Sequence, residues 1–102
     1  MESFSLISPN VKINLVQENE LIKRAIYDFV GRIERTSPYR SVVKFFIVEN
    51  ENGLFSGRLE VTCTSFEILL TKQNDSINTL LEEFKDSFND RLKPWLEGRF
   101  SA

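Results

Sequence analysis

Residues 42–48 read Val-Val-Lys-Phe-Phe-Ile-Val, and this run decides how the rest of the chain can fold. Its β-branched and aromatic residues favour a strand. Successive side chains of a strand point to opposite faces, so both faces of this strand are largely apolar. A strand that is apolar on both faces is typical of the middle of a sheet. We therefore expect further strands on both sides of residues 42–48.

Three other segments have the pattern of strands. Residues 11–16 alternate apolar with polar side chains, and so do residues 55–64 and 66–71. The dipeptide Asn52-Gly53 is a strong hairpin signal and joins the central strand to the next one. Gly57 lies within a strand pattern, where a glycine suggests a β-bulge. Gly53 and Gly57 are therefore interpreted as a turn residue and a bulge residue.

Two segments carry apolar residues at helical spacing. The first starts after the possible N-cap Asn19 and ends before Pro38, since the residue before a proline disfavours helix. The second starts after cap residues 74–76. Pro94 has no amide hydrogen and clashes with the preceding turn. We therefore expect the second helix to kink or stop near Lys93.

The resulting order, β-α-β-β-β-α, predicts an α+β fold. A helical crossover makes the first two strands parallel, and hairpins make the other pairs antiparallel. Two helices packed on one face of a four-stranded mixed sheet would bury every apolar stripe. We expect one domain over residues 1–102 with a core at 10–95, an N-terminal tail at 1–9 and a C-terminal tail at 96–102.

The composition points to a binding module rather than an enzyme. The 102 residues include 13 lysines and arginines against 15 aspartates and glutamates, one cysteine and no histidine. These counts exclude zinc fingers, histidine-dependent catalytic triads and disulfide frameworks. We expect no metal, no cofactor and no small-molecule substrate.

The expected location is the cytoplasm. Residues 1–9 lack the basic and apolar regions of a secretory signal. The chain contains no run of about 18 apolar residues that could span a membrane. The unpaired Cys63 fits a reducing compartment.

Short motifs at three places resemble those of one family. The first strand contains Lys12-Ile13-Asn14-Leu15, and the first helix contains Ile22-Lys23 and Arg32-Ile33-Glu34. With the order of elements, these motifs resemble the ribosome hibernation-promoting factors, or ribosome-associated translation inhibitors, in their short form. The second helix departs from the family pattern, because Ser87 and Asp90 stand where basic residues are common.

The resemblance implies a non-enzymatic protein that lies in the tRNA and mRNA channel of the small ribosomal subunit. It would contact rRNA phosphates, block initiation and preserve idle ribosomes during stress. The charge pattern permits such contacts, since residues 22–44 carry six basic against two acidic side chains. The candidate rRNA-binding residues are Lys23, Arg24, Arg32, Arg35, Arg40 and Lys44. A self-paired helix face is equally compatible, because Asp28 is four residues from both Arg24 and Arg32.

The sheet face without helices offers an alternative function. By alternation, Lys12, Phe46, Arg58 and Leu69 point to this face. An aromatic ring among cations suggests a surface on which RNA bases stack. Because Glu60 and Glu67 share this surface, burial of Phe46 and Leu69 against each other, the N-terminal tail or a second subunit, as in a weak homodimer, is favoured over stacking. An apolar strip on an open sheet can equally mark a site for a protein partner. A diverged domain of this fold would then be a protein-binding or self-associating module. A double-stranded RNA-binding domain fits less well, since 74–76 replaces the lysine cluster expected there.

Overall fold

The computed structural model describes residues 10–100. The elements follow one another as β1 (Val11–Asn14), α2 (Glu20–Thr36), β2 (Val42–Glu49), β3 (Phe55–Thr62), β4 (Glu67–Asn74) and α3 (Ile77–Phe100). This order confirms the predicted β-α-β-β-β-α sequence of elements. The expected tail at 1–9 and residues 101–102 lie outside the described residues.

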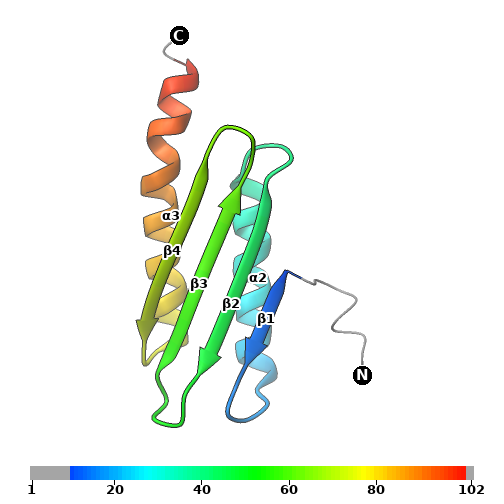
Figure 1. Ribbon diagram of the computed structural model, residues 1–102. Helices are drawn as coiled ribbons and strands as arrows, with labels where there is room; N and C mark the ends of the chain where they lie inside the picture. The colour runs from blue at the N-terminus through cyan, green and yellow to red at the C-terminus, as the bar shows by residue number, and fades with distance from the viewer. Residues whose placement is uncertain (1–9, 101–102) are drawn as a thin grey trace.

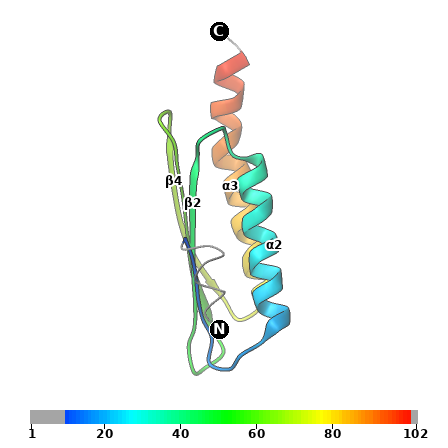
Figure 2. The ribbon, with the colours of Figure 1, turned by 90° about the vertical axis from the view of Figure 1, so that its right-hand side faces the viewer.

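The four strands form one sheet in the order β1-β2-β3-β4. β1 and β2 are parallel, whereas β2–β3 and β3–β4 are antiparallel. Both helices cover the same face, and the other face is open (Figures 1 and 2). The predicted α+β fold, with β2 inside a mixed sheet, is therefore confirmed.

The first helix begins and ends as the sequence indicates. The side chain of Asn19 accepts a hydrogen bond from the Ile22 amide at 3.1 Å, which is the geometry of an N-cap. At the other end, the Ser37 hydroxyl donates to the Ile33 carbonyl at 2.6 Å. Both bonds satisfy backbone groups that a helix terminus otherwise leaves unpaired.

Three phenylalanines join the two layers. Phe45 of β2 lies with its ring centroid 4.9 Å from Phe29 of α2 and 5.2 Å from Phe84 of α3. Phe45 and Phe84 are completely buried. The Phe45–Phe84 pair is T-shaped, an arrangement that aromatic rings favour. This cluster fixes both helices over the middle of the sheet.

Gly57 is a site of close packing, not the bulge that we expected. The β3 register is continuous, with Gly57 paired to Ile47 on one side and Lys72 on the other. A Cβ atom at Gly57 would lie 2.7 Å from Cε2 of Phe84 and 2.8 Å from Cδ1 of Ile47. Only a residue without a side chain lets the Phe84 ring approach the sheet this closely. The turn interpretation of Gly53 is confirmed by its φ of +83°.

Of the two outcomes expected near Lys93, a kink or a stop of the second helix, the stop is wrong. α3 continues through Pro94 to Phe100, so residues 96–100 of the expected C-terminal tail are helical. Trp95 packs against Phe66, with ring centroids 5.3 Å apart in a T-shaped pair. This contact holds the helix against the end of the sheet directly after the proline, and it offsets the backbone hydrogen bond that proline cannot donate.

The strand ends also differ slightly from the expected ranges. β1 ends at Asn14 instead of residue 16. The Val16 amide donates to the Glu49 carboxylate at 3.1 Å and not to a backbone carbonyl of a neighbouring strand. No helix within residues 10–100 is long and apolar enough to cross a membrane.

Replacing Gly57 with alanine tests the close packing of α3 on the sheet. Gly57→Ala should lower the free energy of unfolding by about 1–3 kcal/mol, because the added methyl group overpacks the core. The matched control is Gly31→Ala in α2, where the nearest atom is the mobile Arg35 Nη1 at 3.4 Å. The control should raise stability by up to about 1 kcal/mol, since alanine favours helix. Chemical denaturation measures both, and equal stability of Gly57→Ala and wild type would contradict the packing described.

Candidate nucleic-acid interface

The six candidate rRNA-binding cations do not form one patch. Arg24, Arg32 and Arg35 are exposed on α2, whereas Lys23 is half-buried at its start. Arg40 lies in the loop between α2 and β2. Lys44 is exposed on the open sheet face, across the sheet from the helices. The molecule therefore offers two separate basic surfaces and one basic loop.

The first surface is a groove between the two helices. From α2 it is lined by Asp28, Arg32 and Arg35, and from α3 by Glu82, Lys85 and Asn89, among others. We call it the interhelix groove. Because α2 and α3 contact each other on one face of the sheet, residues of both helices line the groove.

One end of the interhelix groove is basic. Arg32, Arg35 and Lys85 lie there, and no carboxylate is among the described residues that line this part, although Lys85 is paired with Glu82 beside it. The acidic residues Asp28 and Glu82 line the other part. We call the region of these three cations the basic end. Three cations from two helices form a surface of the kind that phosphate groups bind.

The exposed arginines of α2 form no ion pairs within residues 10–100. Within residues 10–100, no carboxylate oxygen lies within 4.0 Å of Arg24, Arg32 or Arg35. The ion pairs of a self-paired helix face, with Asp28 between two arginines, are therefore not formed within the described residues, although the side chains are solvent-exposed. Lys85 does have a partner, since its Nζ lies 3.2 Å from Glu82.

Lys85 was not among the residues that we selected from the sequence. Lys85 directly follows the core residue Phe84. The acidic residues of α3 indicated an outer face unsuited to RNA, so no cation of this helix was selected. The signal was present, because position 85 follows Leu81 by four and precedes Phe88 by three. Both of those residues are buried, so the helical period places Lys85 beside the buried stripe and toward α2.

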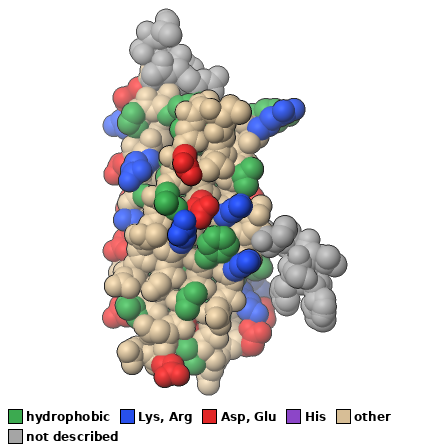
Figure 3. All heavy atoms as spheres, in the orientation of Figure 1, with side chains coloured by type: hydrophobic (Ala, Val, Ile, Leu, Met, Phe, Trp, Pro, Cys, Tyr) green, Lys and Arg blue, Asp and Glu red, His purple; other side chains and the backbone are tan. Residues whose placement is uncertain are grey.

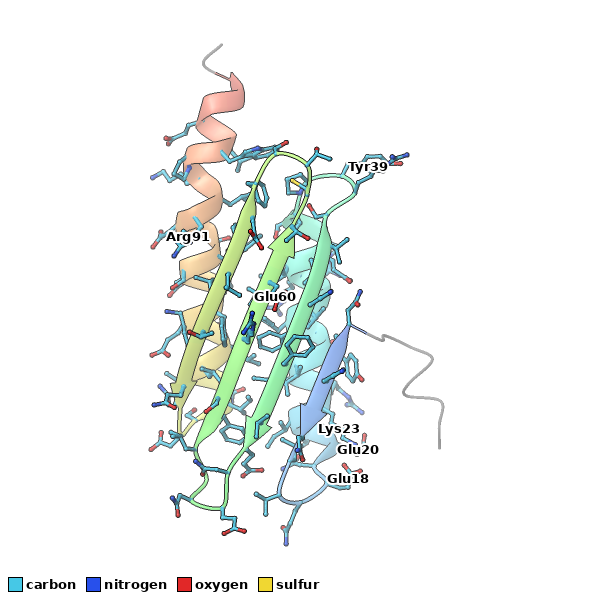
Figure 4. All side chains as sticks on the ribbon, in the orientation of Figure 1. Glu18, Glu20, Lys23, Tyr39, Glu60 and Arg91 are labelled. Carbon is cyan, nitrogen blue, oxygen red and sulfur yellow. The ribbon has the colours of Figure 1, made fainter. Side chains whose placement is uncertain are left out.

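Lys23 is held by an acidic neighbour instead of facing solvent. Its Nζ lies 2.5 Å from Glu18, and only 16% of its side chain is exposed. The hydrogen bond to Glu18 raises the pKa of Lys23, the charges of Glu18 and Glu20 add to this effect, and burial opposes it. Figure 4 shows the three side chains together at the start of α2. Lys23 thus joins the helix to the loop before it.

The basic loop presents an aromatic ring and a cation together. Tyr39 is 87% exposed, and the Arg40 guanidinium carbon lies 5.6 Å from the centre of its ring. Arg40 has a φ of +68°, the left-handed region that side chains other than glycine rarely adopt. The Ser41 amide donates to the Pro38 carbonyl at 3.1 Å and closes this turn. The loop lies at the end of the sheet where Trp95 packs (Figure 4).

The second surface is the open sheet face. The strand register sets Lys12, Phe46 and Arg58 side by side in one row, and sets Lys44 beside Glu60 in the next row. Lys12 Nζ lies 5.9 Å from the centre of the Phe46 ring. Arg58 Nε lies 2.7 Å from a Glu60 carboxylate oxygen. Figure 3 shows basic side chains gathered around a hydrophobic one near the middle of this face.

Leu69 is separate from the other candidates on this face. It is 46% exposed on β4, and it pairs with Glu60 of β3. β3 therefore lies between Leu69 and Phe46, and the two residues occupy different rows. The structure thus brings together Lys12, Phe46 and Arg58, but not Leu69.

Comparisons with known proteins relate this chain to others through its fold. No protein-family model matches the sequence, and no curated protein matches it either. Among solved structures, a ribosomal subunit interface protein from Coxiella burnetii has a similar fold, with a TM-score of 0.61. The two chains are 11% identical, and the match covers 85% of this chain and 97% of that one. This likeness shows that the two chains share a fold.

Removing the Glu18 carboxylate tests the assignment of Lys23 to an internal pair. Glu18→Gln should lower the pKa of Lys23, because both the charge and its hydrogen bond are weakened. The pair stabilises the folded state at pH values below the ordinary lysine pKa, and this contribution is lost as the pH rises through the raised pKa of Lys23. Glu20→Gln is the control and should lower the pKa less, since Glu20 acts only through its charge. An NMR titration measures the pKa, and unchanged titration in Glu18→Gln would contradict the assignment.

Proposed function

We propose that this chain is a non-enzymatic, ribosome-associated translation inhibitor that binds rRNA of the small subunit. The observation that carries the proposal is the basic end, where the exposed Arg32 and Arg35 lie beside Lys85, which is itself paired with Glu82. The similar fold of a protein described as a ribosomal subunit interface protein supports it. The family motifs in the first strand and the first helix support it as well.

Phosphate binding at the basic end does not depend on the charge of the whole chain. The net charge is −2, so the protein as a whole does not attract RNA. Phosphate contacts are local, and each one releases counterions from the nucleic acid. Arg32 and Arg35 are suited to such contacts, because the planar guanidinium binds phosphate oxygens in pairs. Affinity for subunits should therefore fall steeply with salt.

The acidic outer side of α3 restricts how RNA approaches. Glu82 lines the interhelix groove and pairs with Lys85, whereas Glu83, Asp86 and Asp90 are exposed on this helix outside the groove. They repel phosphate, so the rRNA backbone approaches the basic end from the side of α2. Arg24 on the same side of α2 then extends the contact, while Lys23 remains paired with Glu18.

In this proposal, the chain inhibits translation only by occupying a site on the small subunit. A chain seated in the tRNA and mRNA channel excludes both ligands, so initiation is blocked without any catalysed reaction or cofactor. The protein would act in the cytoplasm and would keep idle subunits intact during stress.

Charge reversal at the basic end tests the proposed function. Arg32→Glu with Arg35→Glu should abolish co-sedimentation with purified small subunits, because two phosphate contacts become repulsive. Exposed charges contribute little to stability, so the variant should remain folded. In wild type, the logarithm of the affinity should fall with the logarithm of the salt concentration by about 0.7–0.9 per phosphate neutralised.

The matched control reverses Arg91 and Lys93 to glutamate. Both side chains are exposed on α3 and do not line the basic end, and the change in net charge is the same. Binding close to that of wild type is expected. Failure of the wild-type chain to bind subunits at low salt, or equal loss in both variants, would refute the proposal.

A further inference from the structure

We propose that the open sheet face binds an unpaired RNA nucleotide, with the base stacked on the ring of Phe46. This inference goes beyond the proposed function, because the stacking site is separate from the helices and acts on single-stranded RNA by itself. The supporting observations are the position of Phe46, the hollow beside it and the charges on either side.

Phe46 is an aromatic ring kept on the solvent side of the sheet. Its neighbour Phe45 is completely buried on the helix side, so alternation along β2 directs Phe46 outward. The Phe46 side chain is only partly covered. Within residues 10–100, no helix covers this face (Figure 2). A partly exposed ring in the middle of an open sheet is the arrangement on which unpaired bases stack.

A shallow hollow lies directly beside Phe46. Its volume is about 480 Å³, and its lining includes Phe46, Val48, Ser56, Arg58, Thr71 and Gln73. This volume is within the range of small-ligand sites, about 300–1,000 Å³. Ser56, Thr71 and Gln73 supply hydroxyl and amide groups that can bond to the edge of a base. The Ser56 hydroxyl already lies 3.4 Å from the Gln73 amide oxygen, so these polar groups are close together.

The charges beside Phe46 complement a nucleic acid backbone. Lys12 of β1 and Arg58 of β3 are paired with the two sides of Phe46 in the same row. Lys44 lies two residues earlier on β2, on the same face. A base that stacks on Phe46 therefore has cations on both sides for its flanking phosphates. The contact of Lys12 with the ring is an exposed cation–π interaction, which is weaker than base stacking and yields to it.

Phe46 and Val48 are neighbours on this face, but the exposed Val42 and Leu69 do not join them in the continuous patch that a second copy would need. Lys44 separates Val42 from Phe46 along β2. The ion pair between Arg58 and Glu60 on β3 separates Phe46 from Leu69. Scattered apolar side chains are normal on a surface, whereas interaction sites for proteins are contiguous. RNA therefore fits this face better than self-association does.

Fluorescence anisotropy with a labelled single-stranded oligoribonucleotide of about ten nucleotides tests the proposal. Phe46→Ala should weaken binding by about 10- to 100-fold, because base–aromatic stacking is lost. Phe46→Tyr keeps the ring and should bind like wild type. Leu69→Ala is the matched control, since it removes an equally apolar, exposed side chain from the same face and should not change affinity. Thermal unfolding of each variant verifies that the fold is retained.

Three outcomes would overturn the inference. In the first, wild type does not bind the oligonucleotide at low salt. In the second, wild type and Phe46→Ala bind it equally well. In the third, wild type does not bind RNA but forms a concentration-dependent dimer that Phe46→Ala abolishes. The variant with Arg32→Glu and Arg35→Glu separates this inference from the proposed function. It should lose subunit binding and still bind the oligonucleotide through Phe46, so each proposal can fail without the other.

Discussion

The rest of the structure depends on the contact between the Phe84 ring and the backbone of Gly57. A side chain at position 57 would occupy the space of the ring, so the approach of α3 to β3 requires glycine there. Phe84 also contacts Phe45, and Phe45 contacts Phe29 of α2. One aromatic cluster therefore holds both helices on one face of the sheet. The open face and the interhelix groove are direct results of this arrangement.

The two basic surfaces differ in chemistry as well as position. The basic end of the interhelix groove presents Arg32, Arg35 and Lys85 around a polar and aliphatic lining without an aromatic ring. The open sheet face presents a ring between Lys12 and Arg58. Charged groups without a ring suit phosphates, whereas a ring between cations suits an unpaired base with its phosphates. The proposed functions of the two surfaces are therefore complementary.

Local patterns predicted most of the fold, and tertiary contacts explain where prediction failed. The two-sided apolar run at 42–48, the cap at Asn19 and the turn at Gly53 each act within a few residues, so they could be identified from the sequence. The helix beyond Pro94 depends on Trp95 packing against Phe66, which is distant in the chain. The role of Gly57 likewise depends on Phe84, and no local pattern distinguishes a close approach from a bulge.

The candidate sites were predictable to a similar degree. Outward positions on strands follow from alternation, so Lys12, Phe46 and Arg58 could be grouped before the structure was known. The pairing of Lys23 with Glu18 and the approach of Lys85 to α2 could not, because they depend on how a loop and a second helix are placed. Ribosome binding, and the residues that carry it, stay predictions.

A cryo-electron microscopy map of the chain bound to purified small subunits tests the central claim most directly. We expect density for the chain in the tRNA and mRNA channel, with Arg32 and Arg35 against rRNA phosphates and the acidic side of α3 turned away. A map without the chain, or one in which the interhelix groove faces solvent while another surface contacts the subunit, would contradict it.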